Sequence, residues 1–319
     1  MNLSRRAITL HRFSPIVLAS FALFLSYPLK AQIIADDSLP ANTLVTINDR
    51  TFKIDGGTTK GGNLFHSFTE FSLPTLYEAF FNNAETIHNI ISRVTGGNLS
   101  SIDGLIRANG SANLFILNPN GIIFGTNASL NIGGSFIAST ADSLQFADGS
   151  EFSATDPQTP SILTINVPIG LQYGQHPGAI RVQGTGHSLT IGGNPFFRVL
   201  ERSANPAGLQ VRAGNTLALI GGDVILEGGT LTAQEGRIEL SSVDSALVKL
   251  NPALQGWAFS YTGVENFGDI QLSQRALADV SGVGSGSIQI QGASVLLKEG
   301  WLGIAQSKSR LSSRGKHQR

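Results

Sequence analysis

The chain has 319 residues, of which 41% are hydrophobic and 14% charged, and its formal net charge is +0. A chain without a charge imbalance has no global field to attract nucleic acid or an anionic membrane surface, so neither is an expected partner. The 37 glycines and 12 prolines predict many tight turns between short strands, which favours an all-β architecture. The chain has no cysteine, so no disulfide framework can hold the fold together.

Residues 1–31 have the pattern of a secretory signal peptide. Arg5, Arg6 and Arg12 form a basic start, residues 16–25 form a short apolar core, and Ala31 marks the expected cleavage point. Leu29 is larger than the residue usually found at that position, so the exact cut stays open. The apolar run is too short for a membrane span. This start predicts entry into the general secretory route through the Sec translocon.

The segment from Leu76 to Val94, LYEAFFNNAETIHNIISRV, interrupts the period of two that dominates the rest of the chain. Its apolar residues recur at mixed intervals of three and four, which is compatible with a short helix. An irregular extension is the alternative. Both interpretations stay open at this point.

The stretch from Asn113 to Gly125, NLFILNPNGIIFG, places a turn between two apolar runs. Asn118 can bond its own backbone, Pro119 presets the second position, Asn120 tolerates the third, and Gly121 accepts the conformation that follows. Two strands are therefore expected to meet at a sharp corner over residues 118–121.

A unit of the form Gly-x-apolar-x-apolar recurs in the second half of the chain. It starts at Gly222 (GDVIL), Gly236 (GRIEL), Gly268 (GDIQL) and Gly286 (GSIQI). The uneven spacing suits a coil in which each unit is one strand and the corners vary in length. The expected inward residues include Ile238, Leu240, Ile288 and Ile290. A β-sandwich also produces such alternation, so periodicity alone does not decide between the two folds.

The apolar alternation stops after Ile304. Residues 307–319, SKSRLSSRGKHQR, contain five basic and no acidic residues and are expected to be disordered. Residues 306–319 are therefore predicted to form a basic tail, which is consistent with the hypothesis that the chain is a truncated form of a longer exoprotein.

Several of these segments resemble one known family. The segment Arg107–Thr140 closely resembles the N-terminal secretion domain of filamentous haemagglutinin-like exoproteins of two-partner secretion systems, in which the NPNG-I block is a hallmark. NLFHSFTEF at residues 63–71, IISRVTGG at 90–97 and LTINVPIGLQYG at 163–174 resemble the family in its order. The similarity continues through TLALIGGDVILEGG, GRIEL and YTGVENFGDIQLSQ, and so covers about residues 32–303.

The resemblance implies a right-handed parallel β-helix whose N-terminal end is capped by further β-strands. It favours an irregular extension over a helix at residues 76–94. The implied organisation is a secretion domain at residues 32–260, continuing rungs at 261–305 and the tail beyond. Members usually have a second, upstream Asn-Pro turn, and its counterpart Asn83-Ala84-Glu85-Thr86 lacks the proline and the glycine, so a looser corner is expected there. Members are also generally much longer than this chain.

The resemblance further implies a secreted or cell-surface exoprotein, exported through the periplasm and outer membrane. In this family a cognate outer-membrane transporter binds the domain in extended form through its periplasmic domains. A cell-surface or carbohydrate receptor, and an adhesin or haemagglutinin-like role, would follow export. The residues expected to serve transporter recognition are Asn118, Pro119, Asn120, Gly121, Asn63 and Phe65.

Enzymatic signatures are scarce. The sequence has neither a Gly-x-Ser-x-Gly elbow nor a His-Glu-x-x-His motif, and it predicts no cofactor and no metal site. The histidines are scattered and are expected at the surface or in turns, and GVGSGS at residues 282–287 is expected to be a flexible corner. A secreted β-helical polysaccharide lyase or hydrolase is the alternative function, since such enzymes need carboxylates on one face of neighbouring rungs. The densest acidic group is expected to be a solvated rim, with Glu239 pointing outward; it comprises Asp223, Glu227, Glu235, Glu239 and Asp244.

Overall fold

The computed structural model describes residues 32–157, 163–194, 197–201, 208–253, 256–284 and 286–303. The expected signal peptide, its cleavage point at Ala31 and the expected tail at residues 306–319 lie outside the described residues. All regular secondary structure in these ranges is β-strand. They contain no helix that could span a membrane.

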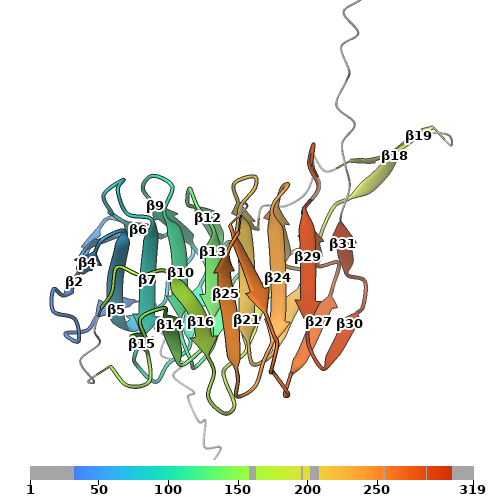
Figure 1. Cartoon of the computed structure of the whole chain (residues 1–319). Helices are drawn as coiled ribbons and strands as arrows, with labels where there is room; N and C mark the ends of the chain where they lie inside the picture. Colours follow the sequence, from blue (N-terminus) through green and yellow to red (C-terminus); the bar gives the residue numbers. More distant parts are fainter. Residues whose placement is uncertain are drawn as a thin grey trace, which may run out of the picture. The chain divides into compact units, whose positions relative to one another are not determined.

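Most strands belong to three faces of a coil, and neighbouring coil strands within a face run parallel (Figure 1). Face 1 stacks β5 (Asn63–Phe71), β7 (Asn89–Val94), β10 (Asn113–Leu117), β13 (Phe136–Ser139), β21 (Thr216–Gly221), β24 (Arg237–Ser242) and β29 (Ser287–Gln291). Face 2 stacks β8 (Ser100–Ile102), β11 (Ile122–Phe124), β17 (Ile180–Gln183), β22 (Val224–Glu227), β27 (Asp269–Ser273) and β30 (Ser294–Leu297). Face 3 contains β3 (Thr51–Gly56), β6 (Glu78–Phe81), β9 (Leu105–Ala108) and β12 (Ser129–Asn131), then β20 (Leu209–Val211), β23 (Thr230–Ala233), β28 (Leu277–Asp279) and β31 (Trp301–Gly303).

The chain visits the faces in a fixed order. β7, β8 and β9 form one rung, and β10, β11 and β12 form the next, each strand pairing with its counterpart one rung away. The register places Ile90 beside Leu114 and Leu114 beside Phe136. These pairings confirm the expected right-handed parallel β-helix and rule out two face-to-face antiparallel sheets.

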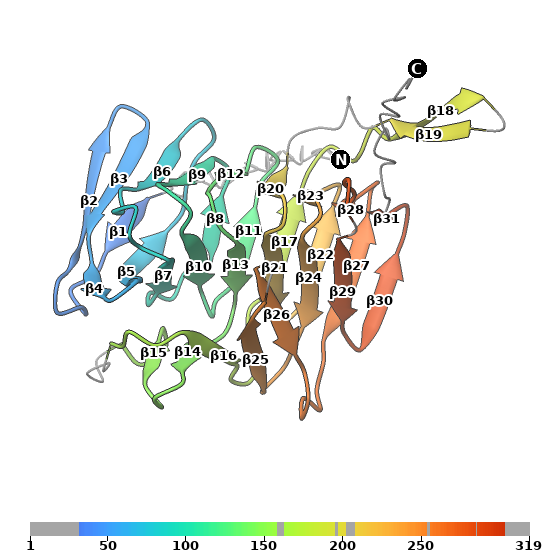
Figure 2. The same ribbon diagram turned by 45° about the horizontal axis from the view of Figure 1, so that its top comes forward.

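Antiparallel strands close the N-terminal end of the coil. β2 (Thr43–Asn48) forms a hairpin with β3, while β1 (Ile33–Ala35) and β4 (Thr58–Lys60) both pair with β5. They lie beside the first rungs (Figure 2). The expected N-terminal β cap is confirmed.

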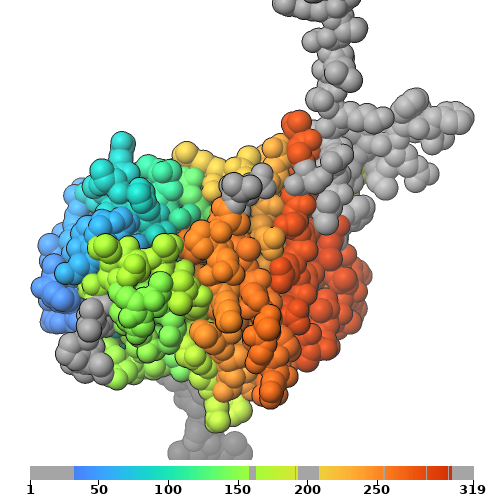
Figure 3. Space-filling model, in the orientation of Figure 1, coloured from blue at the N-terminus to red at the C-terminus, as the bar shows by residue number. Residues whose placement is uncertain are grey.

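A second sheet covers the outer side of face 1. It contains β14 (Ser143–Phe146), β15 (Glu151–Ser153), β16 (Pro168–Gln172), β25 (Leu247–Pro252) and β26 (Trp257–Ser260), all antiparallel. We call it the outer sheet. The outer sheet is made of two insertions into the coil, one between β13 and β17 and one between β24 and β27. The two insertions lie next to each other on the surface in Figure 3. A separate hairpin joins β18 (Thr190–Asn194) and β19 (Phe197–Glu201).

Face 1 is therefore buried on both sides. In β10, Leu114 and Ile116 point into the coil, whereas Phe115 and Leu117 point under the outer sheet, and all four are fully buried. Burial contributes about 25 cal/mol per Å² of apolar surface, so both cores stabilise the fold.

The segment from Leu76 to Val94 forms neither a helix nor an irregular extension. It contains β6, a turn and β7. The turn closes with a 3.1 Å hydrogen bond from the Ile87 amide to the Ala84 carbonyl, so it spans residues 84–87, one position after the expected corner at Asn83–Thr86. Short strands separated by corners shift the phase of the apolar pattern, which explains the mixed spacing of this segment.

The four glycine-led units stack two by two. The unit at Gly222 supplies β22 and pairs with β27 from the unit at Gly268, while β24 from Gly236 pairs with β29 from Gly286. Consecutive units therefore alternate between two faces, which is why their spacing is uneven. The expected inward residues Ile238 and Leu240 are fully buried, and Ile288 and Ile290 pack against the same core.

Two polar residues expected at the surface are buried. His66 is 1% exposed inside the coil, and burial lowers its pKa to about 3. Glu239 points out of the coil as expected, but the outer sheet and the following segment cover it completely, so it does not belong to a solvated rim. The Tyr261 hydroxyl donates a 2.7 Å hydrogen bond to Glu239. Burial raises the pKa of Glu239 to about 8 despite Arg237 at 3.6 Å.

Leu240 tests the inner core. Leu240→Ala should lower the free energy of unfolding by about 2–5 kcal/mol, because the stacked neighbours Leu219 and Ile290 cannot fill the cavity. Leu296→Ala is the matched control. Leu296 is 53% exposed, so its substitution should lower the free energy of unfolding by less than about 0.5 kcal/mol. Urea denaturation measures both, and equal losses would contradict the assignment of Leu240 to the core.

Glu239 predicts a pH dependence of stability. Its folded pKa of about 8 exceeds its ordinary value of 4.5, so the folded protein retains a proton that the unfolded chain releases. Stability should therefore fall as pH rises from about 4.5 to about 8, by about 1.4 kcal/mol per unit of pKa difference. Glu239→Gln should flatten this fall, whereas Glu265→Gln at an exposed position should not. Urea denaturation at pH values between about 4.5 and 8 measures the free energy of unfolding of each variant. If its pH dependence in Glu239→Gln is the same as in the unsubstituted protein, the prediction is wrong.

Candidate functional site

Residues 118–121 form the corner between β10 and β11, as the sequence predicts. The Gly121 amide donates a 3.1 Å hydrogen bond to the Asn118 carbonyl, which closes the β-turn. The Asn120 amide donates to the Asn118 side-chain oxygen at 3.0 Å. Gly121 has φ 118°, a value that L side chains rarely adopt. Asn118, Asn120 and Gly121 therefore take the positions in the turn that the sequence predicts.

The corner is bound to the preceding rung by side chains. The Asn118 Nδ2 donates to the Asn98 carbonyl at 3.0 Å and to the Ser100 hydroxyl at 2.9 Å. The Asn120 Nδ2 donates to the Gly96 carbonyl at 2.7 Å. Two asparagines thus fix the position of one corner on another.

The corner is bound to the following rung through its backbone. The Gly178 amide donates to the Pro119 carbonyl at 2.8 Å, and the Ile122 amide donates to the Ala179 carbonyl at 3.1 Å. A Cβ on Gly178 would overlap the backbone of Asn120 and Gly121. The turn therefore connects three rungs through hydrogen bonds. In the folded domain Asn120 is exposed, Pro119 is half-buried, and Asn118 and Gly121 are buried.

Asn63 lies outside this corner, at the start of β5. It belongs to a ladder in which Asn89 donates to Asn63 and Asn113 donates to Asn89, both at 2.9 Å, at equivalent positions of β5, β7 and β10. The Asn63 amide also donates to the carbonyls of Thr164 and Asn166. Sequence reasoning missed this ladder, although Asn followed by Leu or Ile starts all three strands.

The asparagine ladder borders a groove of about 420 Å³. The groove is also lined by Ile165 and Val167, which are 72% and 45% exposed. Asn63 is itself 2% exposed, so most of its surface faces protein rather than the groove.

Phe65 is fully buried beneath the outer sheet. Its ring makes edge contacts with Phe146 and Phe152, at centroid distances of 5.9 and 5.1 Å. The structure therefore brings together Asn118, Pro119, Asn120 and Gly121, and places Asn63 and Phe65 elsewhere. Four of these six residues are buried: Asn63, Phe65, Asn118 and Gly121.

A buried arginine over the Phe152 ring escaped sequence reasoning. Arg93 donates to the hydroxyls of Ser67 and Ser38, both at 2.9 Å, and to the Ser153 carbonyl. Burial lowers the pKa of Arg93 to about 10, so it remains charged at neutral pH. Burial acts to raise the pKa of Asp36, but hydrogen bonds from Ser38, Thr95 and Ser67 outweigh it and leave that pKa below its usual value. This network links the cap, face 1 and the outer sheet.

The acidic group does not assemble into one site. Asp223 is exposed, Glu239 is sealed under the outer sheet, and Glu235 accepts a 2.7 Å hydrogen bond from the Val283 amide. Within the described ranges, no cluster of three or more His, Asp or Glu side chains could hold a metal ion.

The chain is similar to secretion domains of other proteins. A family model described as "TPS secretion domain" matches residues 31–290. The HMW1 secretion domain from Haemophilus influenzae is 16% identical, with 86% of this chain and 84% of that chain covered and a TM-score of 0.31. A filamentous hemagglutinin secretion domain is 16% identical, with 86% and 99% covered and a TM-score of 0.37.

No curated protein matches the chain. Structural likenesses this distant carry no weight of their own, whereas the family model spans most of the sequence and includes the NPNG corner and its neighbouring rungs. The chain therefore belongs to the TPS secretion domain family, the secretion domains of two-partner secretion exoproteins.

Proposed function

We propose that a cognate outer-membrane transporter recognises this domain through residues 118–121, with Asn63 and Phe65, while the chain is still extended. The observation that carries the proposal is the burial of four of these six residues in the folded domain. A transporter can contact Asn118 or Phe65 only before the coil and the outer sheet form. The same residues then serve first in recognition by the transporter and later in folding of the domain.

The proposed route begins at the Sec translocon, passes through the periplasm and ends outside the outer membrane. Rung-by-rung folding on the far side makes backward movement unfavourable, because each added rung buries apolar surface at about 25 cal/mol per Å². An adhesin or haemagglutinin-like role, with a cell-surface or carbohydrate receptor, is the proposed function after export.

The polysaccharide lyase or hydrolase alternative has less support. It requires carboxylates that converge on a substrate, whereas Glu239 is sealed and hydrogen-bonded to Tyr261. We therefore propose a non-enzymatic role. Release of new reducing or unsaturated ends from plant or algal polysaccharides would reverse that choice.

The corner at 118–121 provides the test of export. Combined Pro119→Ala, Asn120→Ala and Gly121→Ala substitutions should leave the protein in the periplasm of cells that coexpress the transporter. The matched control combines Glu85→Ala and Thr86→Ala, which alter the exposed centre of another hydrogen-bonded turn and should permit normal export. Immunoblots of medium and periplasm measure both.

Two outcomes would contradict the proposal. Normal amounts of the triple variant in the medium would show that the corner is dispensable. Equal retention of Leu240→Ala, at a matched loss of unfolding free energy, would show that the corner acts only through folding. Binding of the transporter's periplasmic domains to the urea-unfolded but not to the folded chain would support recognition before folding.

A further inference from the structure

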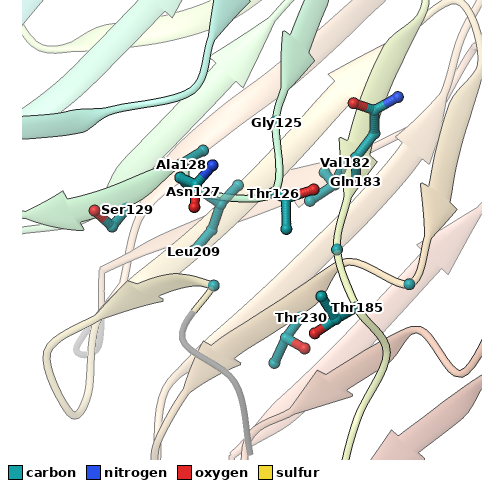
Figure 4. Close-up of a pocket in the computed structure, with 13 residues that line it drawn as sticks. Gly125, Thr126, Asn127, Ala128, Ser129, Val182, Gln183, Thr185, Leu209 and Thr230 are labelled. Carbon is teal, nitrogen blue, oxygen red and sulfur yellow. The ribbon is translucent and has the colours of Figure 1, made fainter. Parts of the chain in front are cut away.

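Asn120 and Gly121 form one of two Asn-Gly pairs in the sequence, and Asn109 and Gly110 form the other. Such a pair is chemically labile, because glycine has no side chain to hinder its amide nitrogen as it approaches the asparagine side-chain carbonyl. Asn127 is the contrasting case, since it is exposed and Ala128 follows it in the corner after β11 (Figure 4). The corner at residues 118–121 therefore contains a reactive pair as well as a turn.

The reaction of an Asn-Gly pair is deamidation, and it has two steps. The Gly121 amide nitrogen loses its proton to solvent and bonds to the Asn120 Cγ, while the Cγ–Nδ2 bond breaks and the nitrogen leaves as ammonia. Water then opens the cyclic imide at either of its carbonyls, which leaves aspartate or isoaspartate at position 120. Nothing is oxidised or reduced, and water is the only co-reactant.

The folded corner opposes the first step. Gly121 is buried, and its amide donates a 3.1 Å hydrogen bond to the Asn118 carbonyl. The Asn120 Nδ2 donates to the Gly96 carbonyl at 2.7 Å and to the Asn118 Oδ1 at 3.2 Å, which holds the side chain on the preceding rung. The Gly121 nitrogen can attack only after it gives up its own hydrogen bond. The reaction therefore requires an open corner.

The product does not fit the folded corner. A carboxylate at position 120 has no proton to donate, so it loses both hydrogen bonds of Asn120 and places a negative charge beside two acceptor oxygens. The Asn118 amide cannot turn round to supply a donor, because its Nδ2 is bonded to the Asn98 carbonyl and the Ser100 hydroxyl. Isoaspartate also lengthens the main chain within the turn, where the Gly178 backbone packs too closely to admit even a Cβ.

We propose that Asn120 is a deamidation site of the unfolded chain and that folding of the corner protects it. Deamidation then limits the time that a chain can remain unfolded and still form this corner. This consequence matters for export only under the proposed function, in which the transporter receives the chain in extended form. The reaction itself does not depend on the transporter.

The first test compares the purified exported chain, folded and unfolded in guanidinium chloride, in slightly alkaline buffer. Peptide mapping by mass spectrometry follows the conversion of each asparagine with time. In the unfolded chain, Asn120 and Asn109 should deamidate at similar rates and Asn127 more slowly. Folding should slow the reaction of Asn120 by about tenfold or more, since it then needs local opening. Equal rates at Asn120 in the two states, or a rate in the unfolded chain no higher than that of Asn127, would overturn the proposal.

Gly121→Ala tests the nucleophile. The variant is measured only in guanidinium chloride, so the strain of an L residue at φ 118° does not affect the result. Deamidation of Asn120 should slow, and deamidation of Asn109 should not change. An unchanged rate at Asn120 would show that the Gly121 amide is not the attacking group.

Asn120→Asp reproduces one product. It should lower the equilibrium constant for folding by about tenfold or more, as expected for the loss of two hydrogen bonds. Asn251→Asp is the matched control, because Asn251 is exposed and its side chain makes no hydrogen bond to another described residue. Urea denaturation measures both variants without the transporter, so a failure of the proposed recognition would leave these results unchanged. Equal stability of the two variants would contradict the proposed limit on folding.

Discussion

The two-sided burial of face 1 is the constraint on which the rest of the structure depends. One side of its strands faces the inner core and the other side faces the outer core, so successive side chains of β10 are buried in the two cores alternately. Strands buried on both sides have near-continuous apolar runs, which is why the sequence FIL at residues 115–117 shows no alternation. The outer sheet is needed because Phe65, Phe115 and their stacked neighbours would otherwise form a large apolar surface.

Three buried polar side chains of face 1 are accommodated in different ways. Asn89 bonds its counterparts one rung before and after, so the ladder also fixes the register of β5, β7 and β10. Arg93 is surrounded by hydroxyls and a backbone carbonyl under the outer sheet. For Glu239, burial raises the pKa to about 8, because neither the 2.7 Å hydrogen bond from Tyr261 nor Arg237 at 3.6 Å offsets the burial of the charge.

Features set by local chemistry could be predicted from the sequence, and features set by tertiary cover could not. The turn at Asn118–Gly121 follows from four neighbouring residues, and the inward positions of Ile238 and Leu240 follow from a period of two. The outer sheet could not be separated from the coil, because β16 and β25 alternate as coil strands do. The burial of Phe65, His66 and Glu239 depends on residues far away in the chain. The helix considered for residues 76–94 is wrong, because the turn between β6 and β7 changes the spacing of the apolar residues from one strand to the next.

The order of contacts along the chain connects this architecture to export. The first stacked rungs, from β5 to β13, join residues close in sequence, such as Asn63 and Asn89, which are 26 residues apart. The later pairing of β13 with β21 joins distant residues, since Ser135 and Thr216 are 81 residues apart. The outer sheet likewise joins distant segments, and its Gln172 and Ala246 are 74 residues apart. Loop closure costs more entropy for the longer separation, so the cap and the first rungs form at lower cost than the pairing of β16 with β25 in the outer sheet. A chain that folds as it leaves a pore from its N-terminal end would therefore gain stability rung by rung, and it would seal Phe65 and Arg93 only when the outer sheet arrives.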